Sequence, residues 1–181
     1  YAGAAPTGSA SEAEYLEIAL AQVVDAAAIH VLLDESLPDG LDVLEVIDAA
    51  DLEKGGLADR LEASRWSIDT SADEALATAA VADFLAAPSV SIERMTKKGL
   101  REFDCRAAVV SLRVAGEGVP EGRVRLDLVL RHGVPSVRPD DVLTGIRAGR
   151  ELDLGGAPLL TRVEQGPLDE ATGTVGDPLA S

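Results

Sequence analysis

Positively charged side chains gather in one segment of an otherwise acidic chain. The 181 residues carry 32 Asp and Glu against 16 Lys and Arg, so the formal net charge is −16 at pH 7. Twelve of the sixteen cations lie in residues 91–150, which hold only eight acids. A reversal of charge sign within one segment favours contact with an anionic partner, for example the phosphates of RNA.

Six cations of this segment are the candidates for binding such an anion. A Lys-Lys-Gly turn at residues 97–99 projects two compact, mobile charges. In residues 123–131 leucines alternate with arginines, so the arginines should face away from any helices that cover the leucines. The predicted anion-binding or RNA-binding residues are Lys97, Lys98, Arg101, Arg106, Arg125 and Arg131.

The same cations allow other interpretations. A lysine turn is also typical of a solvated hairpin tip, and acids such as Asp127 or Glu93 can neutralise arginines as cross-strand pairs. The strands lack aromatic residues on which RNA bases would stack, which disfavours sequence-specific RNA recognition. Charge segregation also lets the acidic N-terminal region pair with the basic segment, within one chain or across a dimer. That alternative predicts a protein-docking surface.

The residues that could perform catalysis do not assemble into a recognisable set. Asp104 and Arg106 should share a strand face as a polar pair, and Cys105 should be a small buried hydrophobe. His30 and His132 have no nucleophile or carboxylate nearby in sequence, and one cysteine with two histidines does not match metal-ligand spacing. We therefore predict no catalytic residue, no metal site and no cofactor.

Hydrophobic periodicity predicts an α+β protein that positions these residues. The first unit has a strand at 13–20, a helix capped by Asp25 that runs to about Ser36, and a strand at 41–47. Further strands are expected at 65–69, 89–95, 103–114, 123–131 and 159–164. Helices are expected after a capping box at 71–74, ending at Pro88, and from Pro139 to Arg150.

From residue 65 onward this order approximates the ferredoxin-like βαββαβ pattern, with an extra hairpin around Lys97–Gly99. In such a fold both helices cover one face of the sheet and leave the other face open. The predicted organisation is a partial N-terminal βαβ unit (1–48), a linker (49–56), a ferredoxin-like domain (57–168) and a disordered tail (169–181).

The distribution of apolar residues predicts where the protein is located. The sequence has no apolar run of about 18 residues and no signal-peptide pattern, so we expect a cytoplasmic protein without a membrane segment. It begins with Tyr1 and its one methionine is Met95. A fragment or a trimmed product is therefore expected.

Three phrases of the sequence stand out as a set. They are Gly8 with Ser11 and Ala13-Glu14-Tyr15-Leu16-Glu17-Ile18, then Thr96-Lys97-Lys98-Gly99 with Asp104 and Arg106, and finally Val137-Arg138-Pro139-Asp140-Asp141-Val142-Leu143. Together they resemble phrases of a family of bacterial radical-SAM-linked proteins of unknown function. The resemblance spans most of residues 5–168. Two phrases usual near the family's N-terminus are missing, so the chain resembles an N-terminally truncated member.

The resemblance implies a partner but no reaction. Members of that family occur beside, or fused to, a radical SAM enzyme, whose cluster needs three cysteines; this chain has only Cys105. We therefore expect a non-catalytic accessory protein that presents RNA or another anionic substrate through a basic sheet face. The alternative is a protein-interaction module with no nucleic-acid role, and the sequence leaves homo-oligomerisation open.

Overall fold

The computed structural model describes residues 2–52, 56–96, 99–116, 118–150 and 152–180. These residues form a mixed five-stranded sheet and four α-helices, so the α+β class is confirmed. The sheet is built by β1 (Ala10–Ser11), β7 (Leu159–Gly166), β2 (Ala63–Thr70), β6 (Val124–Arg131) and β5 (Val109–Val114), in that spatial order. β1 is parallel to β7, and the other neighbouring strands are antiparallel.

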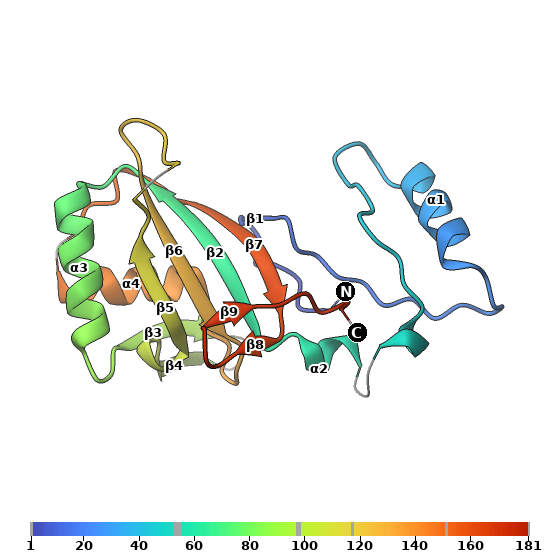
Figure 1. The fold of residues 1–181 in the computed structure, drawn as a ribbon. Coiled ribbons are helices and arrows are strands. Elements are labelled where there is room, and N and C mark those ends of the chain that lie inside the picture. Colours follow the sequence, from blue (N-terminus) through green and yellow to red (C-terminus); the bar gives the residue numbers. More distant parts are fainter. Residues whose placement is uncertain (1, 53–55, 97–98, 117, 151, 181) are drawn as a thin grey trace.

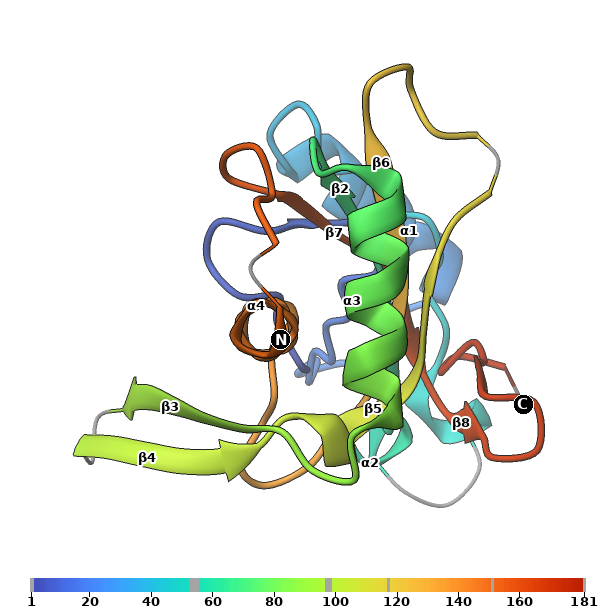
Figure 2. The same ribbon diagram turned by 90° about the vertical axis from the view of Figure 1, so that its left-hand side faces the viewer.

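Two helices, α3 (Glu74–Ala86) and α4 (Pro139–Gly149), pack against the same face of this sheet (Figures 1 and 2). Alternation in β2 and β6 directs Trp66, Ile68, Leu126 and Leu128 toward these helices, where all four are buried. The hydrophobic core therefore lies between the sheet and the helix pair, and the polar residues of the same strands lie on the opposite face, called the open face below.

Local signals explain where the two covering helices begin. Asp73 caps α3, because its Oδ1 accepts a hydrogen bond from the Leu76 N–H. The predicted capping box at 71–74 is thus corrected: the cap is Asp73, not Ser71. At α4 the prediction holds, since Pro139 takes the first position and Asp141 Oδ2 accepts from the Arg138 N–H at 2.8 Å.

A second, two-stranded sheet projects from the body as a hairpin of β3 (Ser91–Thr96) and β4 (Gly99–Asp104) (Figure 2). Ile92 and Phe103 are buried at its base, and the Arg94 guanidinium pairs with Asp141 of α4 and lies over the Phe103 ring. The extra hairpin near residues 97–99 is confirmed. The long strand expected over 103–114 is wrong, because a 3-10 turn at Arg106–Ala108 separates β4 from β5.

The C-terminal residues were also predicted incorrectly. In place of a disordered tail, β8 (Leu168–Asp169) and β9 (Thr174–Val175) form a small antiparallel hairpin. It lies against the end of β7, where Gly166 has the Gly176 carbonyl so close that a side chain would collide with it. The absence of a side chain at Gly166 lets the hairpin approach β7 this closely.

Residues 16–48 depart most from expectation. Helix α1 (Ala26–Ser36) forms as predicted, with Asp25 Oδ1 accepting from the Ala27 N–H at 2.9 Å. The flanking strands at 13–20 and 41–47 do not form, apart from one bridge between Tyr15 and Ala2. The segment extends from the side of the sheet opposite α3 and α4 (Figure 1). Two short helices, η1 (Ala49–Asp51) and α2 (Leu57–Arg60), lead from it into β2.

Candidate functional site

Of the six sequence-predicted cations, the four that the structure describes lie on different elements and do not converge on one place. Arg101 is exposed on the β3–β4 hairpin, whereas Lys97 and Lys98 lie outside the described residues. Arg106 donates to the backbone carbonyls of Leu85 (3.4 Å) and Val109 (3.2 Å), and so joins α3 to β5. These contacts give Arg106 a structural role in the fold. The remaining two, Arg125 and Arg131, are paired with carboxylates.

Arginines of the open face are joined to acids on neighbouring elements. Arg125 makes two hydrogen bonds to Asp69, at 2.7 and 3.0 Å, and Arg131 pairs with Glu170 beyond β8. The Arg125 guanidinium holds the pKa of Asp69 below its usual value. The same arrangement recurs across the face, in Arg65–Glu164 and Arg113–Asp127. Positive charge on this face is therefore largely compensated within the chain.

Asp104, Cys105 and Arg106 also have structural contacts and do not form a reactive group. The Asp104 carboxylate accepts the backbone N–H groups of Val90 and Arg106, both at 2.9 Å, in place of the Asp104–Arg106 pair expected from sequence. Burial raises the pKa of the Cys105 thiol to about 11, so the thiolate is scarce at neutral pH. Cys105 Sγ also packs closely against Gly145 of α4.

A buried arginine on β7 makes several side-chain hydrogen bonds to the N-terminal residues, and sequence reasoning missed it. Arg162 is 2% exposed and donates to Ser11 Oγ (3.2 Å), the Gly3 carbonyl (2.6 Å) and Glu14 Oε1 (2.6 Å). Its guanidinium also lies 5.9 Å from the centre of the Trp66 ring. Arg162 thereby fastens residues 3–14 to the sheet. Ser11 and Glu14 belong to the first phrase of the family resemblance, so two residues of that phrase bind the N-terminal segment to β7 through Arg162.

A chain of hydrogen bonds continues beside this arginine. The Trp66 Nε1–H donates to Ser64 Oγ at 2.8 Å, and the His132 Nδ1–H donates to the Leu61 carbonyl at 2.7 Å. Ser64 Oγ lies 3.1 Å from His132 Nε2, which accepts its proton when the ring is neutral. Burial lowers the pKa of His132. This arrangement stabilises a neutral imidazole.

Exposed apolar side chains are concentrated in residues 16–44. Helix α1 has no buried residue. Over the described residues, fifteen large hydrophobic side chains are exposed, and ten of them belong to this one segment. They are Leu16, Ile18, Leu20, Val23, Val24, Val31, Leu32, Leu37, Leu41 and Leu44. Concentrations of exposed apolar side chains of this kind are typical of surfaces that bind another molecule.

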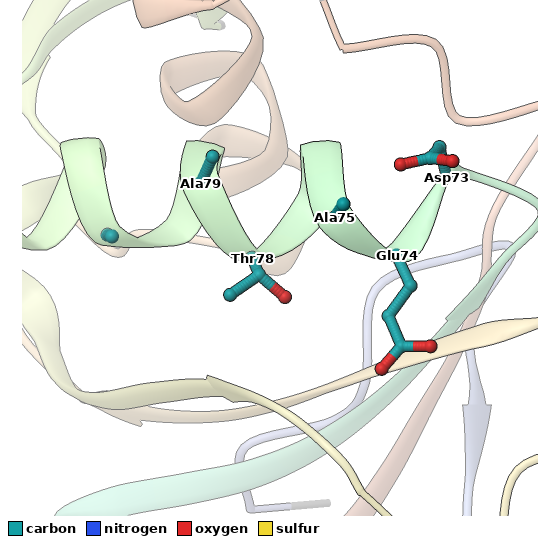
Figure 3. Close-up of a pocket in the computed structure, with 6 residues that line it drawn as sticks. Asp73, Glu74, Ala75, Thr78 and Ala79 are labelled. Atoms are coloured by element: carbon teal, nitrogen blue, oxygen red, sulfur yellow. The ribbon is translucent and has the colours of Figure 1, made fainter.

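Two surface hollows adjoin helix α3. The one in Figure 3 is lined by Asp73, Glu74, Ala75, Thr78, Ala79 and Ala82, all on α3 or at its cap. Since one helix supplies every lining residue, this hollow has no second wall. A groove of about 360 Å³ separates α3 from β5 and is lined on both sides, among others by Val81, Leu85, Leu112 and Val114.

Among the described residues, no three His, Cys, Asp or Glu side chains are grouped so that they could hold a metal ion. Within the same residues, no helix combines the length and apolar character required to cross a membrane.

Comparison with known proteins places the chain in a family. Residues 1–139 match the profile of a family described as an uncharacterized protein conserved in bacteria (DUF2344). The chain belongs to this family. The match includes the arginine-paired residues of β2 and β6, the β3–β4 hairpin and residues 16–48. No curated protein and no solved structure matches the chain. The DUF2344 description carries no activity, so function has to be argued from the molecule.

Proposed function

We propose that this DUF2344 protein is a non-catalytic accessory protein that binds another protein through residues 16–36. The observation that carries the proposal is helix α1, in which no residue is buried by the described part of the chain: Val31 is 54% exposed and Leu32 is 56% exposed. Exposed apolar surface costs free energy in water, and a partner that covers it removes this cost.

Charge defines the chemistry of the partner. Residues 16–48 contain eight acidic side chains and no lysine or arginine. An apolar surface surrounded by one sign of charge favours a partner with an apolar patch bordered by lysine and arginine, and disfavours a second identical segment. The complementary protein is thus expected to be basic around its binding patch.

The resemblance to radical-SAM-linked proteins supplies a candidate partner. We propose that it is a radical SAM enzyme of the same bacterium, acting with this chain in the cytoplasm. The iron–sulfur cluster would belong to that enzyme, because cluster binding requires several cysteine thiolates and this chain has only Cys105. The role of this chain would be to position the enzyme or its substrate.

A binding titration with the purified radical SAM enzyme tests the proposal. We expect the double variant Val31→Asp/Leu32→Asp to reduce affinity at least tenfold, because it places charge in the apolar contact. The matched control is Leu76→Asp, which alters an apolar residue of similar exposure on α3 and should leave affinity unchanged. Equal affinity of the α1 variant and the unchanged chain would contradict the proposal.

We also propose that residues 57–168 adopt the ferredoxin-like arrangement. Support comes from the strand order β7–β2–β6–β5, fully antiparallel, with α3 after β2 and α4 after β6. That order follows the βαββαβ pattern once the β3–β4 hairpin is set aside as an insertion between α3 and β5. A solved structure of a family member, compared with known ferredoxin-like domains, would test this assignment.

A second candidate function is binding of RNA or another anion by the projecting hairpin. The observation that favours it is the exposure of Arg101 on β4, three residues after Lys98 in the sequence. β4 belongs to the hairpin that projects from the body (Figure 2). The open sheet face contributes little, since its arginines are paired with acids. A triple variant of these cations to alanine should flatten the salt dependence of RNA binding, by about 0.7 in log–log slope per lost single-strand contact. Undetectable RNA binding by the unchanged chain would exclude this function.

A further inference from the structure

Strand β5 forms an edge of the five-stranded sheet. Within the part of the chain that the structure describes, it pairs with β6 on one side and has no strand on the other. The edge of a sheet presents N–H and C=O groups that another strand can pair with. β5 therefore offers a place where an extended segment of another chain can add to the sheet.

The register between β5 and β6 identifies which backbone groups face this edge. The Ala115 N–H donates to the Arg125 carbonyl at 2.8 Å. The preceding pair in the register is Val114 with Leu126. In an antiparallel pair of strands, hydrogen-bonded and non-hydrogen-bonded residue pairs alternate. Leu112 and Val114 therefore belong to non-hydrogen-bonded pairs, and their N–H and C=O groups point away from β6 toward the edge.

A groove of about 360 Å³ lies beside this edge, between β5 and α3. Val81 and Leu112 line it and are buried, whereas Leu85 and Val114 line it and are only partly covered. Side chains of a strand alternate between the two faces of a sheet, so every second residue of an added strand would point into the groove. Apolar side chains suit these positions, because they would cover the partly exposed aliphatic walls.

The direction of α3 places an acidic residue at one end of the groove. Arg106 donates to the carbonyls of both Leu85 and Val109, so the end of α3 lies beside the start of β5. The two elements are therefore antiparallel, and Glu74 at the start of α3 lies toward the end of β5. Glu74 lines the groove there and projects from the same side of α3 as Thr78 (Figure 3).

Charge at the groove indicates which kind of segment it accepts. Arg113, the other charged residue of the lining, is paired with Asp127, whereas Glu74 makes no ion pair within the described residues. A lysine or arginine on an added strand would therefore meet an unpaired carboxylate. A second copy of this chain is disfavoured, because its net charge is −16 and its exposed apolar residues 16–48 carry eight acids without a lysine or arginine.

We infer that an extended segment of another protein adds to the β5 edge as an antiparallel strand, with alternate apolar side chains in the groove and a lysine or arginine beside Glu74. The antiparallel direction matches the pairing of β5 with β6 and puts the cation at the N-terminal end of the segment. Groove-facing residues of the segment would lie opposite Leu112 and Val114 and exchange hydrogen bonds with them. This surface is separate from residues 16–36, so either proposal can fail without the other.

A synthetic peptide tests the backbone pairing. The probe is a short fluorescent peptide in which threonine alternates with valine or leucine, and lysine is the first groove-facing residue. Fluorescence anisotropy with the unchanged chain measures its affinity. N-methylation of a groove-facing amide should reduce affinity at least tenfold, because that amide donates to β5, whereas N-methylation of a threonine amide, which faces solvent, should not. Equal effects of the two methyl groups would contradict strand addition.

Two variants of α3 test the groove with the same probe. Ala82→Arg fills the groove with a long side chain at an exposed helical position that tolerates arginine, and should reduce affinity at least tenfold. The matched control is Ala75→Arg, which alters an exposed residue of α3 outside the groove and should leave affinity unchanged. Equal affinity of the two variants for the probe would overturn the inference.

Glu74→Lys tests the charge at the end of the groove. We expect weaker binding of the lysine probe and stronger binding of a probe with glutamate in its place, each by about two- to fivefold. An unchanged preference between the two probes would show that Glu74 does not select the cation. Absence of probe binding at millimolar concentration would overturn the inference as a whole. Self-association of the unchanged chain that Ala82→Arg alone removes, measured by sedimentation velocity, would do the same by assigning the groove to a second copy.

Discussion

The sheet region and residues 16–48 differ in what covers their apolar side chains. Both contain leucine and valine at regular spacing. In the sheet region, Leu126 and Leu128 are covered by α3 and α4, and each strand has a hydrogen-bonded neighbour. In residues 16–48, one helix forms without a buried residue and the expected strands do not form. Apolar spacing therefore produces a strand only where a neighbouring strand pairs with it, whereas a helix satisfies its backbone hydrogen bonds within itself and can form without cover.

The largest expected effect comes from breaking the contact that joins the N-terminal residues to the sheet. Arg162→Ala would leave Glu14 without its partner and remove the donor to the Gly3 carbonyl. We expect the free energy of unfolding to fall by about 3–5 kcal/mol, because a buried side chain is removed and its buried acceptors lose their donor. The Glu14 carboxylate, whose side chain is 35% exposed, can be rehydrated and contributes little to this loss. Urea unfolding followed by Trp66 fluorescence measures it, because Trp66 is the one tryptophan and is buried in the sheet.

The control for this prediction is Arg65→Ala on the open face. Arg65 and Glu164 also pair at 2.7 Å, but their side chains are 39% and 42% exposed. Solvent screens such a pair, so its loss should cost at most about 1 kcal/mol. Equal losses of unfolding free energy for the two variants would show that Arg162 does not hold the N-terminal residues on the sheet.

Truncating one leucine in each region compares their packing directly. Leu128 is fully buried, and Leu128→Ala should reduce the free energy of unfolding by about 2–5 kcal/mol through lost burial and the resulting cavity. Leu44→Ala alters a residue that is mostly exposed and should change it by no more than about 0.5 kcal/mol. A large loss at Leu44, measured by the same urea unfolding, would mean that residues 41–47 are covered in solution.

The same comparison explains what the sequence could predict. Alternation in β2 and β6 was interpreted correctly because both strands have neighbours on each side. Alternation at 41–47 is similar, but whether a partner strand lies beside it depends on the tertiary structure and cannot be seen in the local sequence. The break at Cys105 was missed for a related reason, because Asp104 turns the chain by accepting backbone N–H groups from Val90 and Arg106.

The candidate functional residues were harder to predict, because many arginines pair with acids that lie far away in the sequence. The sequence places Arg125 on a polar strand face, but its pairing with Asp69 depends on the register between β2 and β6. One feature of the sequence could have identified Arg162. It lies two residues after Leu160 on β7, so both side chains point to the same, apolar face of the sheet. An arginine at an inward position requires buried acceptors, and these come from residues 3–14.

Helix capping gives a smaller effect that separates the two regions again. Asp25 and Asp73 cap α1 and α3 in the same way, with hydrogen bonds of 2.9 Å. Asp73→Ala should reduce the global free energy of unfolding by about 0.5–2 kcal/mol. Asp25→Ala should leave it unchanged and increase only the hydrogen exchange of α1 amides, because no residue of α1 is buried. A global loss at Asp25 would show that α1 is docked.

The smallest effect is a pH dependence located in the sheet region. The folded pKa of His132 lies below 6.5, chiefly because burial disfavours the charged ring, so the unfolded chain binds the proton more readily. The stability that depends on neutral His132 is complete above pH 6.5 and decreases as the pH falls from 6.5 toward the folded pKa. We expect the urea midpoint to decrease over that window, and His132→Gln to remove this dependence. The carboxylates of Asp69 and Glu164 have pKa values lowered by their arginines, so they titrate below 3.8 and 4.5, and a midpoint that first declines there would assign the effect to them instead.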